Sequence, residues 1–190
     1  MRVIAGKFRS RQLGALRGLD IRPTSDRLRE TLFNVLTAGN PDALAGSVWL
    51  DLFAGTGAVG IEALSRGAEK VYFVETSRRA VELIKRNLQS MGINNGFEIL
   101  HEEVLHEIPK LERQRVKPNF IFLDPPYSSQ NLYREALEQL ANSVLSEHAL
   151  VIVEHDKKFD PGAVFSAGAL RRVRKLEQGD AGLSFYRCER

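Results

Sequence analysis

The chain has 190 residues, 43% of them hydrophobic and 8% aromatic, which predicts one folded domain with a substantial core and excludes a disordered chain. It has no apolar run near the roughly 20 residues of a membrane helix, and its first residues lack the apolar stretch of a secretory signal. We therefore expect a cytoplasmic protein. The single cysteine, Cys188, excludes an internal disulfide, and we interpret it as a small buried residue in a strand.

Charge is distributed unevenly along the chain, although the net charge is only +3. Residues 1–30 contain eight Lys or Arg against three Asp or Glu, so the remainder is slightly acidic. A basic arm on an acidic body suits a polyanionic partner such as nucleic acid. An ordinary solvated terminus is the alternative interpretation of the same charges.

The N-terminal region precedes the first strand of the expected core. Residues 1–13 alternate apolar and basic side chains, which predicts a short strand or the edge of a hairpin. Pro23 and Thr24 lead into a helix expected over about residues 26–37, where apolar residues recur on one face. We treat residues 1–45 as a basic extension within a single domain, residues 1–190, and expect the extension to contact RNA.

From Val48 onward, apolar strands alternate with helical segments, which predicts an α/β fold with a mostly parallel, Rossmann-like sheet and helices on both faces. After the strand from Val48, further strands are expected at about 70–74, 96–100, 119–123 and 149–153, with helices to about 66, at 77–91 and at 130–142. Two weaker strands, about 169–176 and 183–188, flank a short glycine-bearing link. This link predicts an antiparallel C-terminal hairpin.

The stretch from Asp51 to Gly60 combines the end of a strand, a glycine-rich turn and the start of a helix. Glycine accepts positive φ and lets backbone N–H groups approach a ligand at a helix N-terminus. Gly55, Gly57 and Gly60 also satisfy the G-x-G-x-x-G pattern of dinucleotide binders. Asp51 would repel a pyrophosphate but suits the ammonium and sulfonium of S-adenosylmethionine, unless it only caps the turn.

Further carboxylates follow the next strands, where ligands of open parallel sheets bind. Glu75 ends the second strand and is well placed to accept hydrogen bonds from both hydroxyls of a ribose, unless it is only a solvated strand end. Glu102 and Glu103 follow the third strand, and Asp124 follows the fourth.

The run Asp124-Pro125-Pro126-Tyr127 favours an amine as the acceptor. Neither proline has an N–H and each fixes φ, so the turn presents carbonyl and carboxylate acceptors that suit an exocyclic amino group. The ring of Tyr127 offers a face on which a planar base can stack. Accepting the amine hydrogens localises its lone pair towards a methyl carbon, which predicts direct methyl transfer. Alternatively, the same residues could serve only to end the strand tightly.

Several of these motifs resemble those of a known family. The motifs at residues 51–57 and 124–127 resemble those of class I S-adenosylmethionine-dependent methyltransferases that act on amino groups. The segments 2–11 and 22–33 are similar to the bacterial family that methylates N2 of guanine 966 in 16S rRNA. The resemblance implies S-adenosylmethionine as cofactor and small-subunit rRNA, in an assembling 30S particle, as partner. We expect a monomer, with neither metal nor membrane involved.

By position, the resemblance implies three groups of site residues. The cofactor residues would be Asp51, Phe53, Ala54, Gly55, Thr56, Gly57, Glu75, Thr76, Glu103 and Val104. The catalytic residues would be Asp124, Pro125, Pro126 and Tyr127. The RNA-binding residues would be Lys7, Arg9, Arg11, Arg22 and Arg27. Many relatives have Asp or Asn followed by Ala after the third strand, so the Glu103-Val104 pair leaves the adenine contact open between Glu102 and Glu103. Arg27 could instead support the catalytic loop.

Other functions fit parts of the pattern. The same chemistry could act on adenine or cytosine of DNA or on a protein glutamine. The glycine pattern alone fits an NAD-dependent dehydrogenase, and the basic arm alone fits a non-catalytic RNA-binding assembly factor. The sequence also leaves open which nucleotide is modified and whether Asp124 removes a proton or only orients the amine.

Overall fold

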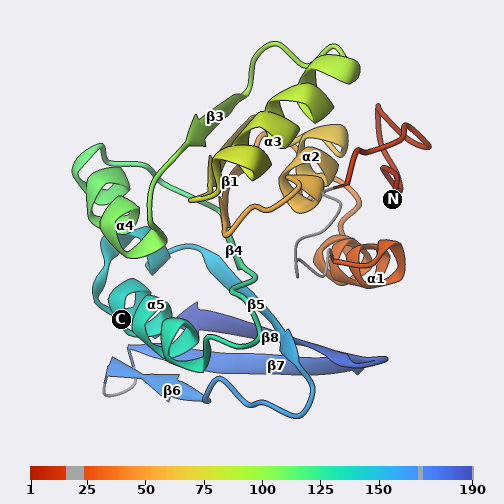
Figure 1. Cartoon of the computed structure of the whole chain (residues 1–190). Helices are drawn as coiled ribbons and strands as arrows, with labels where there is room; N and C mark the ends of the chain where they lie inside the picture. The colour runs from red at the N-terminus through yellow and green to blue at the C-terminus, as the bar shows by residue number, and fades with distance from the viewer. Residues whose placement is uncertain (16–23, 167–168, 190) are drawn as a thin grey trace. The chain divides into compact units, whose positions relative to one another are not determined.

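The computed structural model describes residues 1–15, 24–166 and 169–189. The chain divides into two compact units, Met1–His101 and Glu102–Arg190 (Figure 1). Arg22, one of the predicted RNA contacts, lies outside the described residues. The single domain predicted for residues 1–190 stays a prediction.

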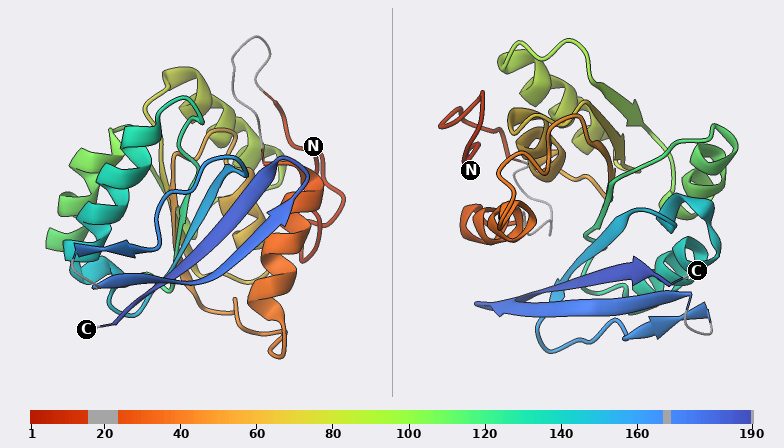
Figure 2. Two further views of the ribbon diagram at one scale, coloured as in Figure 1. Left: turned by 90° about the horizontal axis from the view of Figure 1, so that it is seen from below. Right: turned by 180° about the vertical axis from the view of Figure 1, so that it is seen from behind.

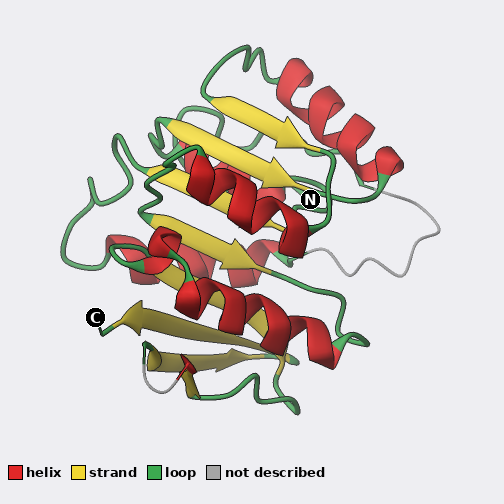
Figure 3. Cartoon of the chain, turned by 90° about the vertical axis from the view of Figure 1, so that its left-hand side faces the viewer, coloured by secondary structure: helices red, strands yellow, loops and turns green. Residues whose placement is uncertain are grey.

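The first unit contains three parallel strands in the order β3-β2-β1, which run in one direction (Figure 3). Their bounds are Val48–Leu52 for β1, Lys70–Val74 for β2 and Phe97–Leu100 for β3. Trp49 pairs with Val71 and Asp51 with Phe73, so these four side chains belong to one face of the sheet. The strands expected in this part of the sequence are therefore confirmed.

Three helices pack on that face of the first unit: α1 (Asp26–Thr37), α2 (Ala58–Ser65) and α3 (Arg78–Ser90). The ring of Phe33 in α1 stacks on Trp49 with centroids 5.4 Å apart. Helix α2 approaches the sheet closely at Gly60, where a Cβ would come within 2.3 Å of the Phe73 ring. The two longer helices begin at serines, as Ser25 and Ser77 accept backbone hydrogen bonds at their N-caps.

The N-terminal hairpin, residues 1–13, closes through an antiparallel bridge between Arg2 and Gln12. This confirms the hairpin expected from the alternating sequence. It is fixed to α2 because both carboxylate oxygens of Glu62 accept backbone N–H groups, from Ile4 at 2.7 Å and from Ala5 at 3.0 Å. The basic extension is therefore attached to the body of the first unit.

The second unit contains five strands in the order β4-β5-β8-β7-β6. Their bounds are Phe120–Leu123 (β4), Leu150–Asp156 (β5), Val164–Phe165 (β6), Leu170–Gln178 (β7) and Ala181–Cys188 (β8). Strands β4 and β5 are parallel, and the remaining pairs are antiparallel. The long β7–β8 hairpin is visible in both views of Figure 2, and it confirms the predicted C-terminal hairpin.

Two details of this hairpin differ from expectation. Strand β8 begins at Ala181 rather than near 183, because Ala181 already pairs with Gln178 across a two-residue turn. Cys188 is half-buried rather than buried, since it lies at the open end of the hairpin opposite Leu170. The fold class is as predicted: α/β, with mostly parallel strands and an antiparallel C-terminal hairpin.

The helices of the second unit are α4 (Val104–Arg113), α5 (Gln130–Asn142) and a short 3-10 turn (Val144–Ser146). Helix α4 was not expected from the sequence, because it contains Pro109, which is unfavourable inside a helix. Proline has no N–H for the carbonyl of Leu105, and the Nε2 of Gln139 in α5 donates to that carbonyl instead, over 2.9 Å. A contact from a neighbouring helix thus replaces the missing bond.

Candidate methyl-transfer site

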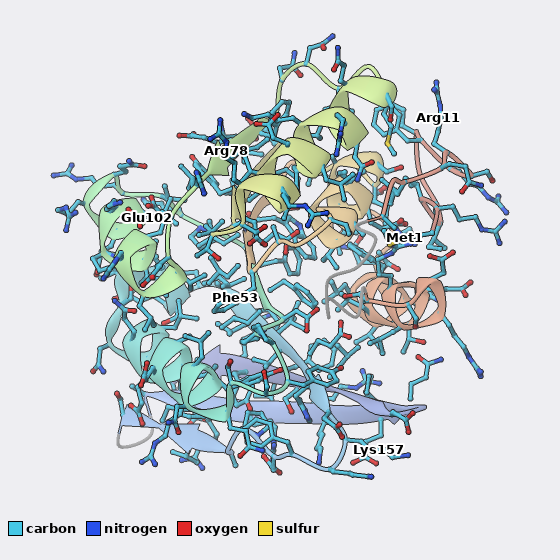
Figure 4. All side chains as sticks on the ribbon, viewed as in Figure 1. Met1, Arg11, Phe53, Arg78, Glu102 and Lys157 are labelled. Atoms are coloured by element: carbon cyan, nitrogen blue, oxygen red, sulfur yellow. The ribbon has the colours of Figure 1, made fainter. Side chains whose placement is uncertain are left out.

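The turn after β1 has an unusual backbone. Phe53, Gly55 and Gly57 all have left-handed φ, at 67°, 55° and 75°. For glycine this conformation is unstrained, whereas for Phe53, labelled in Figure 4, it costs on the order of 1 kcal/mol. Strain of this kind persists where the surrounding structure enforces it, and it concentrates at ligand-binding sites. We call residues 53–57 the cofactor turn, after the role that the sequence predicts for them.

Asp51 lies beneath the cofactor turn, with only 2% of the residue exposed. Its Oδ2 accepts the backbone N–H of Gly60 over 2.9 Å and so links the strand end to α2. Burial raises the pKa of Asp51 to about 8, the Gly60 bond opposes this rise, and the charge of Glu75 adds to it. The turn-capping contact is therefore present, and a cation nearby would favour the ionised carboxylate.

Glu75 fixes the cofactor turn from the neighbouring strand. Its Oε2 accepts the N–H of Gly55 and its Oε1 accepts the N–H of Ser77, each over 2.8 Å. A carboxylate offers about four lone-pair directions, so these two bonds leave acceptor capacity for ribose hydroxyls. The ribose role of Glu75 stays a prediction.

The other cofactor candidates of the first unit surround the same turn. Ala54 donates its N–H to the carbonyl of Val74 over 3.0 Å, and Thr56 is buried. Thr76 is exposed, and its carbonyl lies 2.8 Å from the Nε2 of His101. Residues 51–65 contain no Lys or Arg whose charge could bind a pyrophosphate.

Glu102, Glu103 and Val104 belong to the second unit. Glu102 is bound by Lys110, with Nζ and Oε2 2.6 Å apart, and this contact lowers its pKa. The side chain of Glu103 is 67% exposed at the N-cap of α4, and Val104 is buried. Of the two carboxylates, Glu103 is the more accessible to a ligand.

Residues 124–127 follow β4 in the second unit, and we call them the acceptor loop after the role that the sequence predicts for them. Asp124 and Tyr127 are half-buried, Pro125 is buried and Pro126 is exposed. The hydroxyl of Tyr133 donates to the Pro125 carbonyl over 2.8 Å. Burial raises the pKa of Tyr133, so the hydroxyl stays protonated and available as a donor.

Two more contacts hold this loop. The hydroxyl of Tyr127 donates to Oε1 of Glu154 over 3.4 Å, and the N–H of Ser129 donates to the Pro126 carbonyl over 2.8 Å. Both proline carbonyls thus accept one hydrogen bond within the unit. Each has a second lone pair, so the predicted acceptor character of the turn is compatible with these contacts.

Tyr133 was not singled out from the sequence, although it lies on the inner face of α5. Tyr133, Ala136, Leu137 and Leu140 are fully buried, whereas Leu132 is only half-buried. These four positions have the three- and four-residue spacing of a helix face. In the sequence, Glu154 is distinguished only as a charged residue that directly follows an apolar run.

The predicted RNA-binding residues that the structure describes lie at two places in the first unit. Lys7, Arg9 and Arg11 are exposed on the N-terminal hairpin, where Arg11 is labelled in Figure 4. Arg27 is exposed on α1. Arg29, which was not singled out, is buried and pairs with Asp26 at 2.8 Å, so it supports α1 rather than offering charge to a ligand.

Across the described residues, no cluster of three or more His, Cys, Asp and Glu side chains is arranged to hold a metal ion. None of the helices formed by those residues is both long enough and apolar enough to span a membrane.

Solved structures place the fold in a known class. The chain is similar to a putative methyltransferase, yhhF, from Escherichia coli, with a TM-score of 0.80, 27% identity and coverage of 100% of this chain and 98% of the other. It is also similar to the putative methylase HI0767 from Haemophilus influenzae, with a TM-score of 0.74, 31% identity and coverage of 97% and 96%. A putative methyltransferase, SMU.776, solved in complex with SAH, shares the fold at 17% identity and a TM-score of 0.63, over 84% of this chain and 48% of that one. The chain therefore has the class I methyltransferase fold.

Sequence comparison identifies the family. The family described as "Conserved hypothetical protein 95" matches residues 1–187. The chain is 34% identical over 190 residues to the putative rRNA methyltransferase YlbH of Bacillus subtilis, covering 98% of each. It is 38% identical over 161 residues to ribosomal RNA small subunit methyltransferase D of Haemophilus influenzae, covering 83% of this chain and 79% of that protein. The chain belongs to this family, and the resemblance seen in its sequence is confirmed.

Proposed function

We propose that the chain transfers a methyl group from S-adenosylmethionine to the exocyclic N2 amine of a guanine in 16S rRNA. The observation that carries this proposal is the acceptor loop, an Asp-Pro-Pro-Tyr run held by Tyr133, in a chain whose relatives are named as rRNA methyltransferases. The carboxyl groups of Asp51 and Glu75, which bond to Gly60 and Gly55, support a cationic donor, and the names of the relatives argue against a nicotinamide dehydrogenase.

On the donor side, S-adenosylmethionine supplies a methyl group carried on a positively charged sulfur. Asp51 and the backbone of Gly55 and Gly57 would bind its methionine part, and the carboxylate of Glu75 would accept the ribose hydroxyls. Phe53, Ala54, Thr56 and Thr76 would complete this surface. Glu103 and Val104 would contact the adenine.

On the acceptor side, Asp124 and the carbonyl of Pro125 would accept the two hydrogens of the guanine amine. Both acceptors draw the nitrogen lone pair out of conjugation and towards the methyl carbon. The N–C bond forms as the C–S bond breaks, and the extra proton on nitrogen leaves to Asp124 or to water. Tyr127 would stack on the base, and Pro126 would stiffen the loop.

The exposed charges of the N-terminal hairpin, together with Arg22 and Arg27, would contact rRNA phosphates. Such contacts position the RNA without choosing the base. The substrate would be presented in an assembling 30S particle, where protein and folded RNA together expose the target guanine.

The proposal is tested with purified protein, labelled S-adenosylmethionine and small-subunit particles from cells that lack the gene. We expect label in 16S rRNA and, by mass spectrometry of nucleosides, N2-methylguanine. Parallel reactions with duplex DNA and with a glutamine-containing peptide test the other amine acceptors. Label only in DNA or peptide, or no label while RNA still binds, would overturn the assignment.

A further inference from the structure

Asn87 lies on α3 and is only 3% exposed, although it shares a helix face with the buried residues Ala80, Ile84 and Leu88. A polar amide enclosed in this way needs hydrogen-bond partners, because a buried polar group without them destabilises the fold. An apolar side chain would fill the space without that requirement. We therefore attribute the presence of an amide at this position to its hydrogen bonds.

Those partners are backbone groups from two separate segments. Nδ2 of Asn87 donates to the carbonyl of Thr56 over 3.0 Å, and Oδ1 accepts the N–H of Gly14 over 2.8 Å. A carbonyl can only accept and an N–H can only donate, so the two partners also fix the orientation of the amide. One side chain joins residue 56 to residue 14.

Thr56 belongs to the cofactor turn and lies between Gly55 and Gly57, which have positive φ angles of 55° and 75°. The bond from Asn87 holds the peptide unit between Thr56 and Gly57, whose N–H in turn donates to the carbonyl of Ala54 over 2.7 Å. The position of Asn87 therefore bears directly on the geometry of the proposed donor site.

Gly14 directly follows the N-terminal hairpin that carries the exposed basic residues. The hairpin end lies along α3, where Nη1 of Arg11 is 3.4 Å from the carbonyl of Ser90. A Cβ added to Gly14 would come within 2.9 Å of Leu83 and 3.1 Å of Oδ1 of Asn87, so the chain approaches the helix closely here. At this close approach, Oδ1 of Asn87 accepts the N–H of Gly14.

We propose that Asn87 is a positioning residue that couples the N-terminal hairpin to the cofactor turn. This inference rests on the proposed function, since it takes the turn as the donor site and the hairpin as an RNA contact. Donor binding at the turn holds the hairpin in place for RNA. By linkage, RNA bound to the hairpin tightens donor binding by the same factor.

Hydrogen exchange of the full chain tests the coupling without RNA, with S-adenosylhomocysteine as the probe. In the unchanged protein we expect the probe to slow amide exchange about 5-fold or more both at residues 53–57 and at residues 11–15. In Asn87→Ala, measured at saturating probe, slowing at 53–57 persists while slowing at 11–15 disappears. Gln89→Ala, an exposed amide on the same helix, should behave as the unchanged protein does.

Two further variants keep the test independent of any folding defect in Asn87→Ala. Asn87→Asp can still accept the Gly14 N–H but has no N–H for Thr56, whereas Gly14→Ala places a Cβ against Leu83 and Oδ1 of Asn87 and so acts at the hairpin end of the link. Both should lose the response at 11–15 with an unchanged circular dichroism spectrum. Equal slowing at 11–15 in all variants, with the probe bound, would overturn the coupling alone. If the probe fails to bind the unchanged protein, the donor assignment is overturned, and the coupling with it. If the response at 11–15 is seen but rRNA is not methylated, only the proposed substrate is overturned.

Discussion

The hydroxyl of Tyr133 and the carbonyl of Pro125 are joined by a hydrogen bond of 2.8 Å, and the tyrosine that makes it is only 1% exposed. The bond fixes the direction of a carbonyl that we propose as an acceptor for the target amine. Nearby negative charges, first among them that of Asp124, add to burial in raising the pKa of Tyr133. The phenol therefore remains a donor throughout the working pH range.

Replacement of Tyr133 by Phe removes this bond and leaves the ring in place. We expect kcat for rRNA methylation to fall about 3- to 10-fold, because one neutral hydrogen bond contributes about 0.5–1.5 kcal/mol. The affinity for S-adenosylmethionine, measured by calorimetry, should stay the same. Tyr72→Phe, at a ring that contacts Lys70 on β2, is the matched control and should keep full activity. Unchanged kcat in Tyr133→Phe would show that the bond has no part in positioning the loop.

Replacement of Asp124 by Ala tests the acceptor directly. If the carboxylate orients or deprotonates the amine, kcat should fall by about 100-fold or more. Binding of S-adenosylhomocysteine should change by less than about 2-fold, because the cofactor turn is left intact. Asp180→Ala removes a carboxylate that pairs with Lys157 at 3.2 Å in the β7–β8 turn, and it controls for loss of an acidic residue. Full activity in Asp124→Ala would refute the catalytic assignment.

The parts of the fold that the sequence predicted are those specified by local patterns. The strands of the first unit, the helices α1 and α3 and the glycine turn each follow from a few adjacent residues. The positive φ of Gly55 and Gly57 is what their place in the turn required. The candidate residues of that turn were found for the same reason.

The parts that were missed depend on contacts between distant residues. Helix α4 contains Pro109, and the carbonyl it leaves unpaired is bonded by a side chain of α5. Tyr133 and Asn87 acquire their roles only when the loop or segment they hold is folded against them. A single sequence shows each of them only as a polar group on an apolar helix face.

Asp51 should make donor binding dependent on pH. Because burial raises its pKa to about 8, the free protein holds this carboxyl protonated at neutral pH. A cationic donor favours the carboxylate, so binding below about pH 8 must release a proton. We expect the affinity for S-adenosylmethionine to rise from pH 6 to about pH 8 and then to level off, as measured by calorimetry.

The variant Asp51→Asn isolates this effect, since the titration of the donor itself is common to both proteins. Its affinity for S-adenosylmethionine should be weaker at pH 8, and binding should release almost no proton from this position. Stability gives a second readout. The carboxyl of Asp51 loses its proton near pH 4 in the unfolded chain and near pH 8 in the folded chain. The free energy of unfolding therefore falls as the pH rises from 4 to 8. Asp51→Asn should lack that contribution. Identical pH profiles in the two proteins would contradict the assignment.

Gly6 and Gly39 form a natural pair for a test of the N-terminal hairpin. Both have left-handed backbones, with φ of +81° and +80°. A Cβ at Gly6 would lie 1.9 Å from the carbonyl oxygen of Ser65, whereas a Cβ at Gly39 would meet nothing within 4 Å. The next residues are bonded to the same serine, the N–H of Lys7 to its carbonyl and the N–H of Phe8 to its hydroxyl.

Replacement of Gly6 by Ala should therefore displace the hairpin from α2, whereas Gly39→Ala adds only the strain of a left-handed alanine. In urea unfolding we expect Gly39→Ala to lose about 1 kcal/mol and Gly6→Ala about 2–4 kcal/mol. Only Gly6→Ala should weaken binding to rRNA, with a shallower dependence of the affinity on salt concentration, because the basic residues of the hairpin no longer reach their phosphates together. Filter binding across a salt series measures both quantities. If the two variants bound rRNA equally well, the hairpin would have no role in holding the substrate.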